Sequence, residues 1–256
     1  MSQTEAVGST VPTISIVTAT FNAAALLPRL VASLKAQTDQ DFEWVVADGG
    51  SSDDTVKIVE AAKVSLRQVV LTSQQDFGIY DALNRGVKSA QGTFYLVIGA
   101  DDEFHPEAVA NYKQAIANSG ADLVTAHVRS GAVIRGPRAR RWPWLYGPFA
   151  YVSGHAVGLA VRRSLHLQVG YYSRKLPIAA DQLFILKAIK NGARVSSHDF
   201  EAGHFEAVGG TSGQDVLGTL LEGYRAQLAT GQSRLVQTAI LMVRLIKNWR
   251  TIRHGL

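Results

Sequence analysis

Hydrophobic and polar residues follow two alternating periods along the first half of the chain. Four short apolar runs, rich in β-branched and aromatic residues, predict buried β-strands at residues 13–19, 42–48, 67–73 and 94–98. Apolar residues at helical spacing then predict helices at residues 24–37, 52–62, 78–90 and 107–117. Strand–helix alternation of this length indicates an α/β fold with a mostly parallel sheet and helices on both faces.

The pattern loosens in the second half of the chain. Residues 121–128 predict a strand, residues 179–192 a helix, and residues 193–200 another strand. Between them, residues 129–153 have no regular period and hold five arginines and two tryptophans. The sequence shows no internal repeat and no low-complexity segment.

Three of the predicted strands end in loops with polar or acidic residues. The loops are TATFN at 18–22, ADGGSSDDT at 47–55 and GADDE at 99–103. In a doubly wound sheet such loops gather along one edge, where α/β proteins bind ligands. Asp48 precedes two glycines, so it is a candidate for bonding a base or ribose, with an Asx turn as the alternative. Asp101 and Asp102 carry like charges, which repel one another unless a cation or a network of hydrogen-bond donors offsets them. The alternative is that both are simply solvated in a loop.

Composition narrows the classes of protein that fit. The 256 residues suit one large domain, or one with an appendage, and the net charge of +5 favours nucleotides, phosphates, nucleic acid or an anionic membrane as partners. The absence of cysteine excludes disulfides, thiolate metal sites and cysteine nucleophiles. Neither the GxGxxG fingerprint after the first strand nor a Walker P-loop occurs, which disfavours ordinary dehydrogenases and P-loop enzymes. No secretory signal is visible, and no window approaches the ~18 apolar residues of a membrane span.

Four segments together resemble the family 2 glycosyltransferases of the GT-A fold. They are ISIVTATFN, EWVVADGGSSDDT, DFGIYDALNRGVKSAQGTFYLVIGADDE and AADQLFILKAIKNG. The resemblance implies a GT-A domain at residues 13–212, with a single Rossmann-like sheet, a flexible N-terminus at 1–12 and a C-terminal helical extension at 213–256. The subgroup that the chain resembles builds bacterial surface polysaccharides, transferring sugars from nucleotide donors to lipid-linked or saccharide acceptors. The implied enzyme is an inverting, metal-dependent glycosyltransferase of the hexosyltransferase class.

For the carboxylate pair, the resemblance implies a place on the donor side of the site. Asp102 is the implied direct metal ligand, for Mn²⁺ or Mg²⁺, and Asp101 reaches the donor's ribose or sugar. Such a metal has a chemical purpose, because the departing diphosphate gains charge that a cation held by carboxylates can neutralise.

For the nucleotide, the resemblance places four further residues. Thr20 and Phe21 are expected near the base, and Asp48 is expected to bond the base or the ribose. Arg85 is a candidate for a phosphate contact, although a solvated helix arginine is the common alternative. Phe21 equally suits a core position, and its ring adds no base specificity.

An inverting transfer also needs a base that deprotonates the acceptor hydroxyl. The family places a carboxylate at the start of a late helix, usually as Glu-Asp. Here the match is Asp181, with Ala180 in place of the first acid. An Asp that merely favours the helix macrodipole is the alternative. His155 and His204 are weaker candidates, for contacts with the acceptor and with the diphosphate or metal, because a lone histidine is more often structural.

Two basic, aromatic segments raise the question of partners. Residues 135–149 and the tail at 232–256 combine arginine with tryptophan, and the tail predicts an imperfectly amphipathic helix interrupted on its apolar side by Arg250. Such a helix can lie on a membrane, pack on the domain or form a homodimer. The sequence thus predicts a cytoplasmic protein, or one peripheral to the inner face of the cell membrane.

Three other functions fit parts of the sequence. A sugar nucleotidyltransferase shares the α/β layout but carries a glycine-rich basic loop after the first strand, where this chain has TATFNAA. A nonenzymatic module could keep the fold, although the retained aspartates argue against it. A basic nucleic-acid-binding protein would also use arginine and tryptophan. The glycosyltransferase motifs disfavour nucleic acid as a partner.

Overall fold

The structure is a computed structural model that describes residues 12–136, 142–205 and 215–254. Its strands are β1 (Ile14–Thr20), β2 (Glu43–Asp48), β3 (Val69–Ser73), β4 (Phe94–Val97), β5 (Glu103–Phe104), β6 (Leu123–Ser130), β7 (Val133–Arg135), β8 (Leu159–Arg162) and β9 (Val195–His204). Its helices are α1 (Leu27–Lys35), α2 (Thr55–Ala62), α3 (Ile79–Ser89), α4 (Ala108–Ser119), α5 (Pro143–Tyr146), α6 (Leu165–Val169), α7 (Ala180–Lys190), α9 (Val216–Ala229), α10 (Arg234–Lys247) and α11 (Trp249–His254). Two 3₁₀ turns, η1 (Gly147–Ala150) and η2 (Ala156–Gly158), precede β8.

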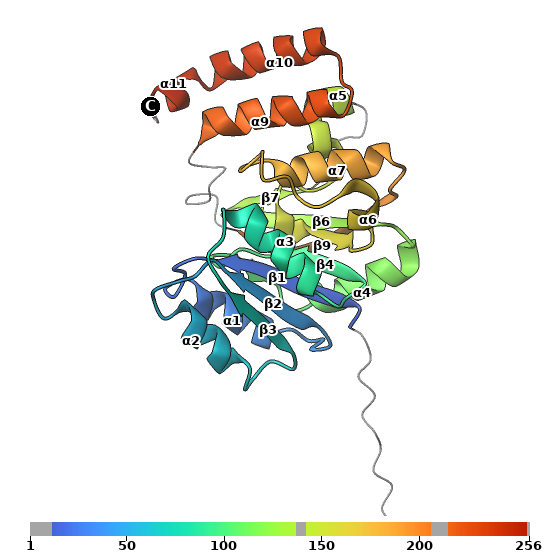
Figure 1. Cartoon of the computed structure of the whole chain (residues 1–256). Coiled ribbons are helices and arrows are strands. Elements are labelled where there is room, and N and C mark those ends of the chain that lie inside the picture. The colour runs from blue at the N-terminus through green and yellow to red at the C-terminus, as the bar shows by residue number, and fades with distance from the viewer. Residues whose placement is uncertain (1–11, 137–141, 206–214, 255–256) are drawn as a thin grey trace, which may run out of the picture.

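One sheet organises the molecule (Figure 1). Its strand order is β3-β2-β1-β4-β8-β6-β9-β5, with β7 paired to β6. The first four strands in this order pair in parallel, and β6 pairs with β9 in parallel. Strand β8 is antiparallel to both of its neighbours, β4 and β6. The α/β fold with a mostly parallel sheet flanked by helices, as predicted from the sequence, is confirmed.

Alternate residues of the central strands enter two separate cores, one on each face of the sheet. On β2, Trp44 and Val46 pack in the core that α1, α2 and α4 cover. Val45 points to the opposite core, which α3, α6 and α7 cover. Because successive side chains of a strand face opposite sides, a strand buried on both faces has a nearly continuous apolar sequence.

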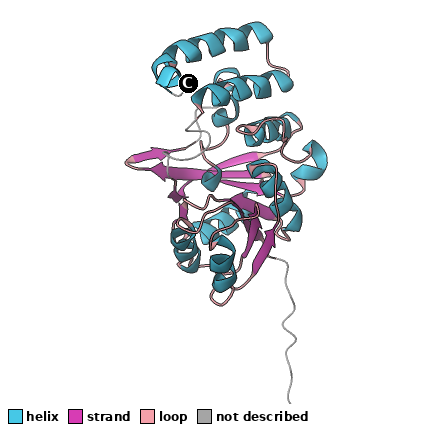
Figure 2. Ribbon diagram, turned by 60° about the vertical axis from the view of Figure 1, so that its left-hand side comes forward, coloured by secondary structure: helices cyan, strands magenta, loops and turns pink. Residues whose placement is uncertain are grey.

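The C-terminal helices form a layer of their own beyond α7 (Figures 1 and 2). Helix α9 packs on α7, and α10 folds back along α9. Gln237 of α10 donates to the carbonyl oxygen of Trp144 on α5 at 2.7 Å. The C-terminal helical extension is therefore present, although the helix predicted at 232–256 is divided at Asn248. Among the described residues, no helix is long and apolar enough to cross a membrane.

The irregular stretch at 129–153 includes β7, α5 and η1, while residues 137–141 within it lie outside the described residues. The predicted flexible N-terminus at 1–12 also falls outside them, except for Pro12. Strand β8, four residues long, was not predicted from the sequence.

Candidate active site

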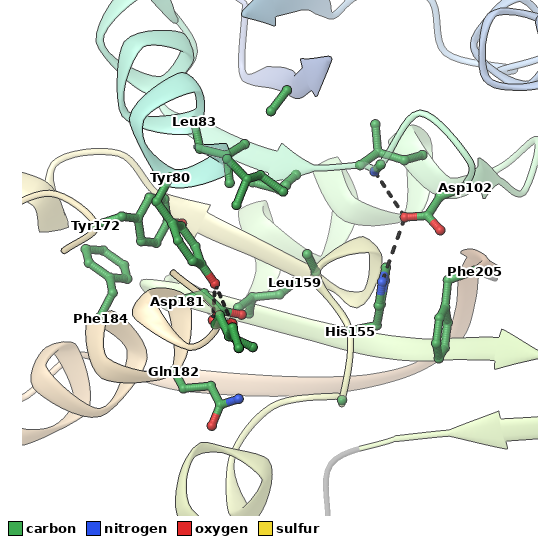
Figure 3. A pocket seen from close by; sticks show the side chains of 18 of the residues that line it. Tyr80, Leu83, Asp102, His155, Leu159, Tyr172, Asp181, Gln182, Phe184 and Phe205 are labelled. Atoms are coloured by element: carbon green, nitrogen blue, oxygen red, sulfur yellow. Dashed lines mark hydrogen bonds and ion pairs between the residues drawn. The ribbon is translucent and has the colours of Figure 1, made fainter. Parts of the chain in front are cut away.

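A cavity of about 650 Å³ opens at the carboxyl ends of β1 and β4 (Figure 3). Its walls come from α3, the turn after β4, the segment that leads into β8, the amino end of α7 and Thr219 of α9. Most of the lining is apolar. Among the described residues that line it, the acidic side chains are Asp101, Asp102 and Asp181. The structure thus brings the predicted donor-side carboxylates and the predicted base to one cavity.

Asp101 and Asp102 lie in the tight turn after β4. The backbone N–H of Gly99 donates to Asp102 Oδ2 at 3.0 Å. A Cβ atom on Gly99 would lie 2.6 Å from Asp101 Oδ1 and 2.9 Å from Asp102 Oδ2, so a side chain here would displace both carboxylates. Asp102 is only 3% exposed, at the wall of the cavity.

His155 faces Asp102, with Nε2 3.8 Å from Asp102 Oδ2, as Figure 3 shows. Its ring stacks on Phe205 at 4.1 Å between centroids, and Nδ1 accepts a hydrogen bond from the N–H of Val157. Burial, together with the nearby charge of Arg135, lowers the pKa of His155 to about 4. The imidazole is therefore neutral at physiological pH and adds no positive charge beside Asp102.

Asp181 lies across the cavity, in the first turn of α7. The hydroxyl of Tyr80, on α3, lies 2.8 Å from Asp181 Oδ1 and 3.0 Å from the carbonyl oxygen of Ile178. Burial raises the pKa of Asp181, the hydrogen bond from Tyr80 opposes that rise, and the charge of Glu222 adds to it. A carboxylate with a raised pKa is a stronger proton acceptor than an ordinary one.

A buried polar chain supports Tyr80 from behind. Tyr172 packs against Tyr80 at 5.5 Å between centroids, and its hydroxyl lies 2.6 Å from that of Tyr95. The Tyr95 hydroxyl in turn lies 2.8 Å from Nε2 of His166, whose Nδ1 lies 3.1 Å from the carbonyl oxygen of Gly170. Since a carbonyl only accepts, Nδ1 carries the proton and Nε2 accepts from Tyr95. These hydrogen bonds hold Tyr172 in place against Tyr80, whose hydroxyl contacts Asp181.

Asp48 is fully buried at the end of β2. Its Oδ1 accepts from the hydroxyls of Thr20 and Ser51. Its Oδ2 accepts from the backbone N–H groups of Gly50 and Ser51 and from the Ser73 hydroxyl, at 2.6 to 3.0 Å. Burial alone would raise the pKa of Asp48, but these hydrogen bonds outweigh burial and lower it. In the free protein Asp48 therefore organises the loop after β2, and its contact with a base or ribose stays a prediction.

The other two nucleotide candidates differ in exposure. Phe21 lines the cavity and is 66% exposed, so it is not a core residue. Arg85 is mostly buried, and its Nη2 donates to the carbonyl oxygen of Asp48 at 2.6 Å while lying 4.0 Å from Asp76 Oδ2. Arg85 thus ties α3 to the end of β2, and a phosphate contact from it stays a prediction.

His204 lies at the end of β9, opposite Glu103 of β5, and is not among the described residues that line the cavity. Its approach to a diphosphate or metal stays a prediction. The sequence did not single out Tyr80 or Phe205, although both line the cavity. An aromatic residue among apolar neighbours is indistinguishable from core in the sequence, and only the fold shows which ones border the cavity.

The side chains at this wall of the cavity suit a divalent cation that a bound ligand also coordinates. Asp101 and Asp102 offer carboxylate oxygens and His155 a neutral imidazole, groups that Mn²⁺ accepts. Among the described residues no three or more acidic, histidine or cysteine side chains are assembled to hold an ion by themselves. Mg²⁺ and Mn²⁺ commonly complete such a partial set with water and substrate phosphates.

The sheet, its carboxyl-end cavity and the facing carboxylates define the class of a GT-A glycosyltransferase. The sequence model of Glycosyl transferase family 2 matches residues 15–171. A PGL/p-HBAD biosynthesis glycosyltransferase of Mycobacterium tuberculosis is 32% identical over 193 residues, which cover 73% of this chain and 73% of the relative. The chain belongs to glycosyl transferase family 2, and it is a glycosyltransferase.

Solved structures share the fold. TarS of S. aureus, in complex with UDP-GlcNAc, has a TM-score of 0.67 at 22% identity, with 94% of this chain and 74% of that chain covered. The mannosyltransferase PcManGT of Pyrobaculum calidifontis, in complex with GDP-Man and Mn²⁺, has a TM-score of 0.69 at 18% identity, with 96% and 74% covered. At these identities the likeness shows the fold alone, and the predicted GT-A fold is confirmed.

Proposed function

We propose that this glycosyltransferase moves a sugar from a nucleoside-diphosphate sugar to a hydroxyl group of a lipid-linked or saccharide acceptor, with inversion, in surface polysaccharide biosynthesis. The observation that carries the proposal is the placement of Asp102 and Asp181 on facing walls of one cavity. The solved structures in complex with UDP-GlcNAc and with GDP-Man support this class of donor.

In the proposed reaction, Asp181 accepts the proton of the acceptor hydroxyl. The acceptor oxygen forms a bond to the anomeric carbon while the bond from that carbon to the diphosphate oxygen breaks. One displacement from the opposite face inverts the anomeric configuration. The hydrogen bond from Tyr80 holds Asp181 in place, and the raised pKa of Asp181 increases its affinity for the proton.

Asp102 would hold the cation, with Asp101 at the donor's ribose or sugar. His155, expected from the sequence at the acceptor, lies 3.8 Å from Asp102, which supports a place beside the diphosphate instead. When bound, Mn²⁺ or Mg²⁺ supplies positive charge that stabilises the departing diphosphate. Phe21, in the cavity lining, and Thr20 would lie near the base, and a bond from Asp48 to the base or ribose would replace one of its present hydrogen bonds.

We also propose an anionic membrane surface as the place where a lipid-linked acceptor is met. Helices α10 and α11 expose a row of apolar side chains, namely Leu235, Val236, Met242, Val243, Ile246 and Trp249. Exposed basic residues, Arg234, Lys247, Arg250 and Arg253, accompany them. No acidic residue follows Glu222 in the sequence, so this surface suits anionic lipid.

A thermal-shift panel of UDP, GDP, dTDP and CDP sugars, with and without Mn²⁺, tests the donor class. A bound donor stabilises by mass action, about 2.7 kcal/mol at a hundredfold excess over Kd. One nucleotide series should raise Tm more with Mn²⁺ than without it. A flat response across the whole panel would contradict the proposed function.

A further inference from the structure

We propose that Glu222, on the C-terminal helix α9, is a positioning residue for the transfer reaction: its carboxylate holds the amino end of α7 and thereby sets the position and electrostatic surroundings of Asp181. The inference rests on the proposed role of Asp181 as the base. It makes the C-terminal extension a working part of the active site.

The N-cap residue of α7 offers no side-chain cap, although Asp181 in the first turn accepts from the backbone N–H groups of Gln182 and of Asp181 itself. The residue before the helix is Ala179, which has no side chain that could accept a hydrogen bond, and Ala180 follows it. Glu222 Oε2 instead accepts from the backbone N–H groups of Ile178 and Ala179, both at 2.9 Å. Glu222 is 7% exposed, so its carboxylate accepts hydrogen bonds from these N–H groups rather than mainly from water. A negative charge at the start of a helix is also favourable to the helix macrodipole.

Helix α9 packs closely against the segment that precedes α7. A Cβ atom on Gly218 would lie 2.7 Å from Ile178 Cδ1, so only glycine allows this approach without a shift. Thr219, one turn before Glu222, lines the cavity itself. The family match ends at residue 171, so α9 lies beyond the part of the chain that the match covers.

The groups that face Asp181 come from several elements. Tyr80 reaches it from α3, and Glu222 on α9 interacts with it electrostatically, as do the hydroxyls of Tyr172 and Tyr95. Across the cavity lie Asp101, Asp102 and His155. Burial raises the pKa of Asp181, the hydrogen bonds from Tyr80 and from the backbone N–H groups of Gln182 and Asp181 lower it, and the charge of Glu222 raises it further. Burial raises the pKa of Tyr80, which keeps that hydroxyl neutral.

Two variants should move the titration of Asp181 in opposite directions. Glu222→Gln keeps an oxygen that accepts from Ile178 and Ala179 but removes the charge, so the pKa of Asp181 should fall. Tyr80→Phe removes the hydrogen bond that favours the carboxylate, so the pKa should rise. The matched control Glu60→Gln, on the exposed face of α2, should move nothing.

The titration is measured by NMR of ¹³C-labelled aspartate carboxyl carbons, with Asp181 assigned through Asp181→Asn, and in parallel by the acid limb of the kcat–pH profile. We expect Glu222→Gln to move both to lower pH and Tyr80→Phe to move both to higher pH. If Glu222→Gln does not fold, Glu222→Asp, whose carboxylate is drawn back toward α9, should shift them the same way by less. An unchanged Asp181 titration in the folded variant would overturn the proposal. The NMR measurement needs no turnover, so it separates this failure from a failure of the proposed transfer.

Discussion

Asp48 and Asp102 are both buried aspartates at the carboxyl ends of strands, and their neighbours give them different tasks. Asp48 accepts five hydrogen bonds, which bind it to the loops around it. Asp102 instead borders the cavity and faces a neutral histidine. Donors that already saturate a carboxylate favour a structural role, whereas a cavity and a neutral ligand favour metal binding.

Asp102→Asn should abolish Mn²⁺-dependent binding of a nucleoside diphosphate without unfolding the protein. An amide still accepts from the Gly99 N–H, but it lacks the charge that holds a cation. Calorimetry with and without Mn²⁺ measures the effect. Asp54→Asn, a change at an exposed aspartate on the surface, is the control. Unaltered metal-dependent affinity would show that Asp102 is not a ligand.

At the scale of residues, the sequence predicts the acidic side chains of the candidate site but not the residues that hold them in place. Asp101, Asp102 and Asp181 could be located because motifs mark them. The partner of Asp181, Tyr80, is 101 positions away in the sequence, and Glu222 is 43 positions from Ala179. Contacts of this kind leave no periodic signal, because the fold alone brings the residues together.

At the scale of elements, the end of β2 depends on Asp48, which links β1, β2 and β3 through Thr20, Ser51 and Ser73. Asp48→Asn should lower the free energy of unfolding by about 2–4 kcal/mol, because an amide nitrogen cannot accept and leaves buried donors unsatisfied. Chemical denaturation measures it, with Asp199→Asn on the exposed side of β9 as the control. Equal stability of the two variants would contradict this role.

The same carboxylate predicts a pH dependence. Because the folded pKa of Asp48 is lowered, its contribution is fully present above its unfolded value of about 3.9 and is lost as pH falls through the folded pKa. The difference in stability between wild type and Asp48→Asn should therefore shrink below about pH 4.

The elements that the sequence predicted are those with a clear helical period or a continuous apolar run. The parallel strands β1 to β4 and the helices between them were predicted in type and order. Strand β4, four residues long, was predicted from its apolar run, whereas β7 and β8, of three and four residues, were not predicted. The tail helix ends at Lys247 and restarts at Trp249. Strand β9 extends to His204, beyond the predicted end at residue 200, because it pairs with β6 as far as His204 and with β5 at Gly203 and His204.

At the scale of the whole molecule, the C-terminal layer has two apolar sides. Leu241 and Ile252 are buried, while Val243 and Ile246 are 65% and 77% exposed. Packing on the protein, one expectation for the tail, is therefore confirmed for one side of the helix. The exposed side still needs an explanation, and the accompanying basic residues favour an anionic surface.

Val243→Glu combined with Ile246→Glu should release the protein from anionic vesicles while leaving donor affinity unchanged. The change adds negative charge to an apolar contact, and each basic residue nearby contributes only about 1 kcal/mol of attraction. Flotation with phosphatidylglycerol-containing vesicles at low salt measures it. Val64→Glu, at a 93% exposed valine elsewhere, is the control. If wild-type protein ignores such vesicles and instead forms a dimer that the double variant disrupts, the surface is a homodimer interface.

The central claim is that Asp181 accepts the acceptor's proton in a cavity that binds a nucleotide sugar. Asp181→Asn, assayed for transfer and for donor binding with the donor identified by the panel, tests it most directly. We expect kcat to fall by roughly 10²-fold or more, with donor Kd near the wild-type value, because the amide keeps the shape of the side chain and loses the base. Normal turnover by this variant would contradict the account and place the base elsewhere.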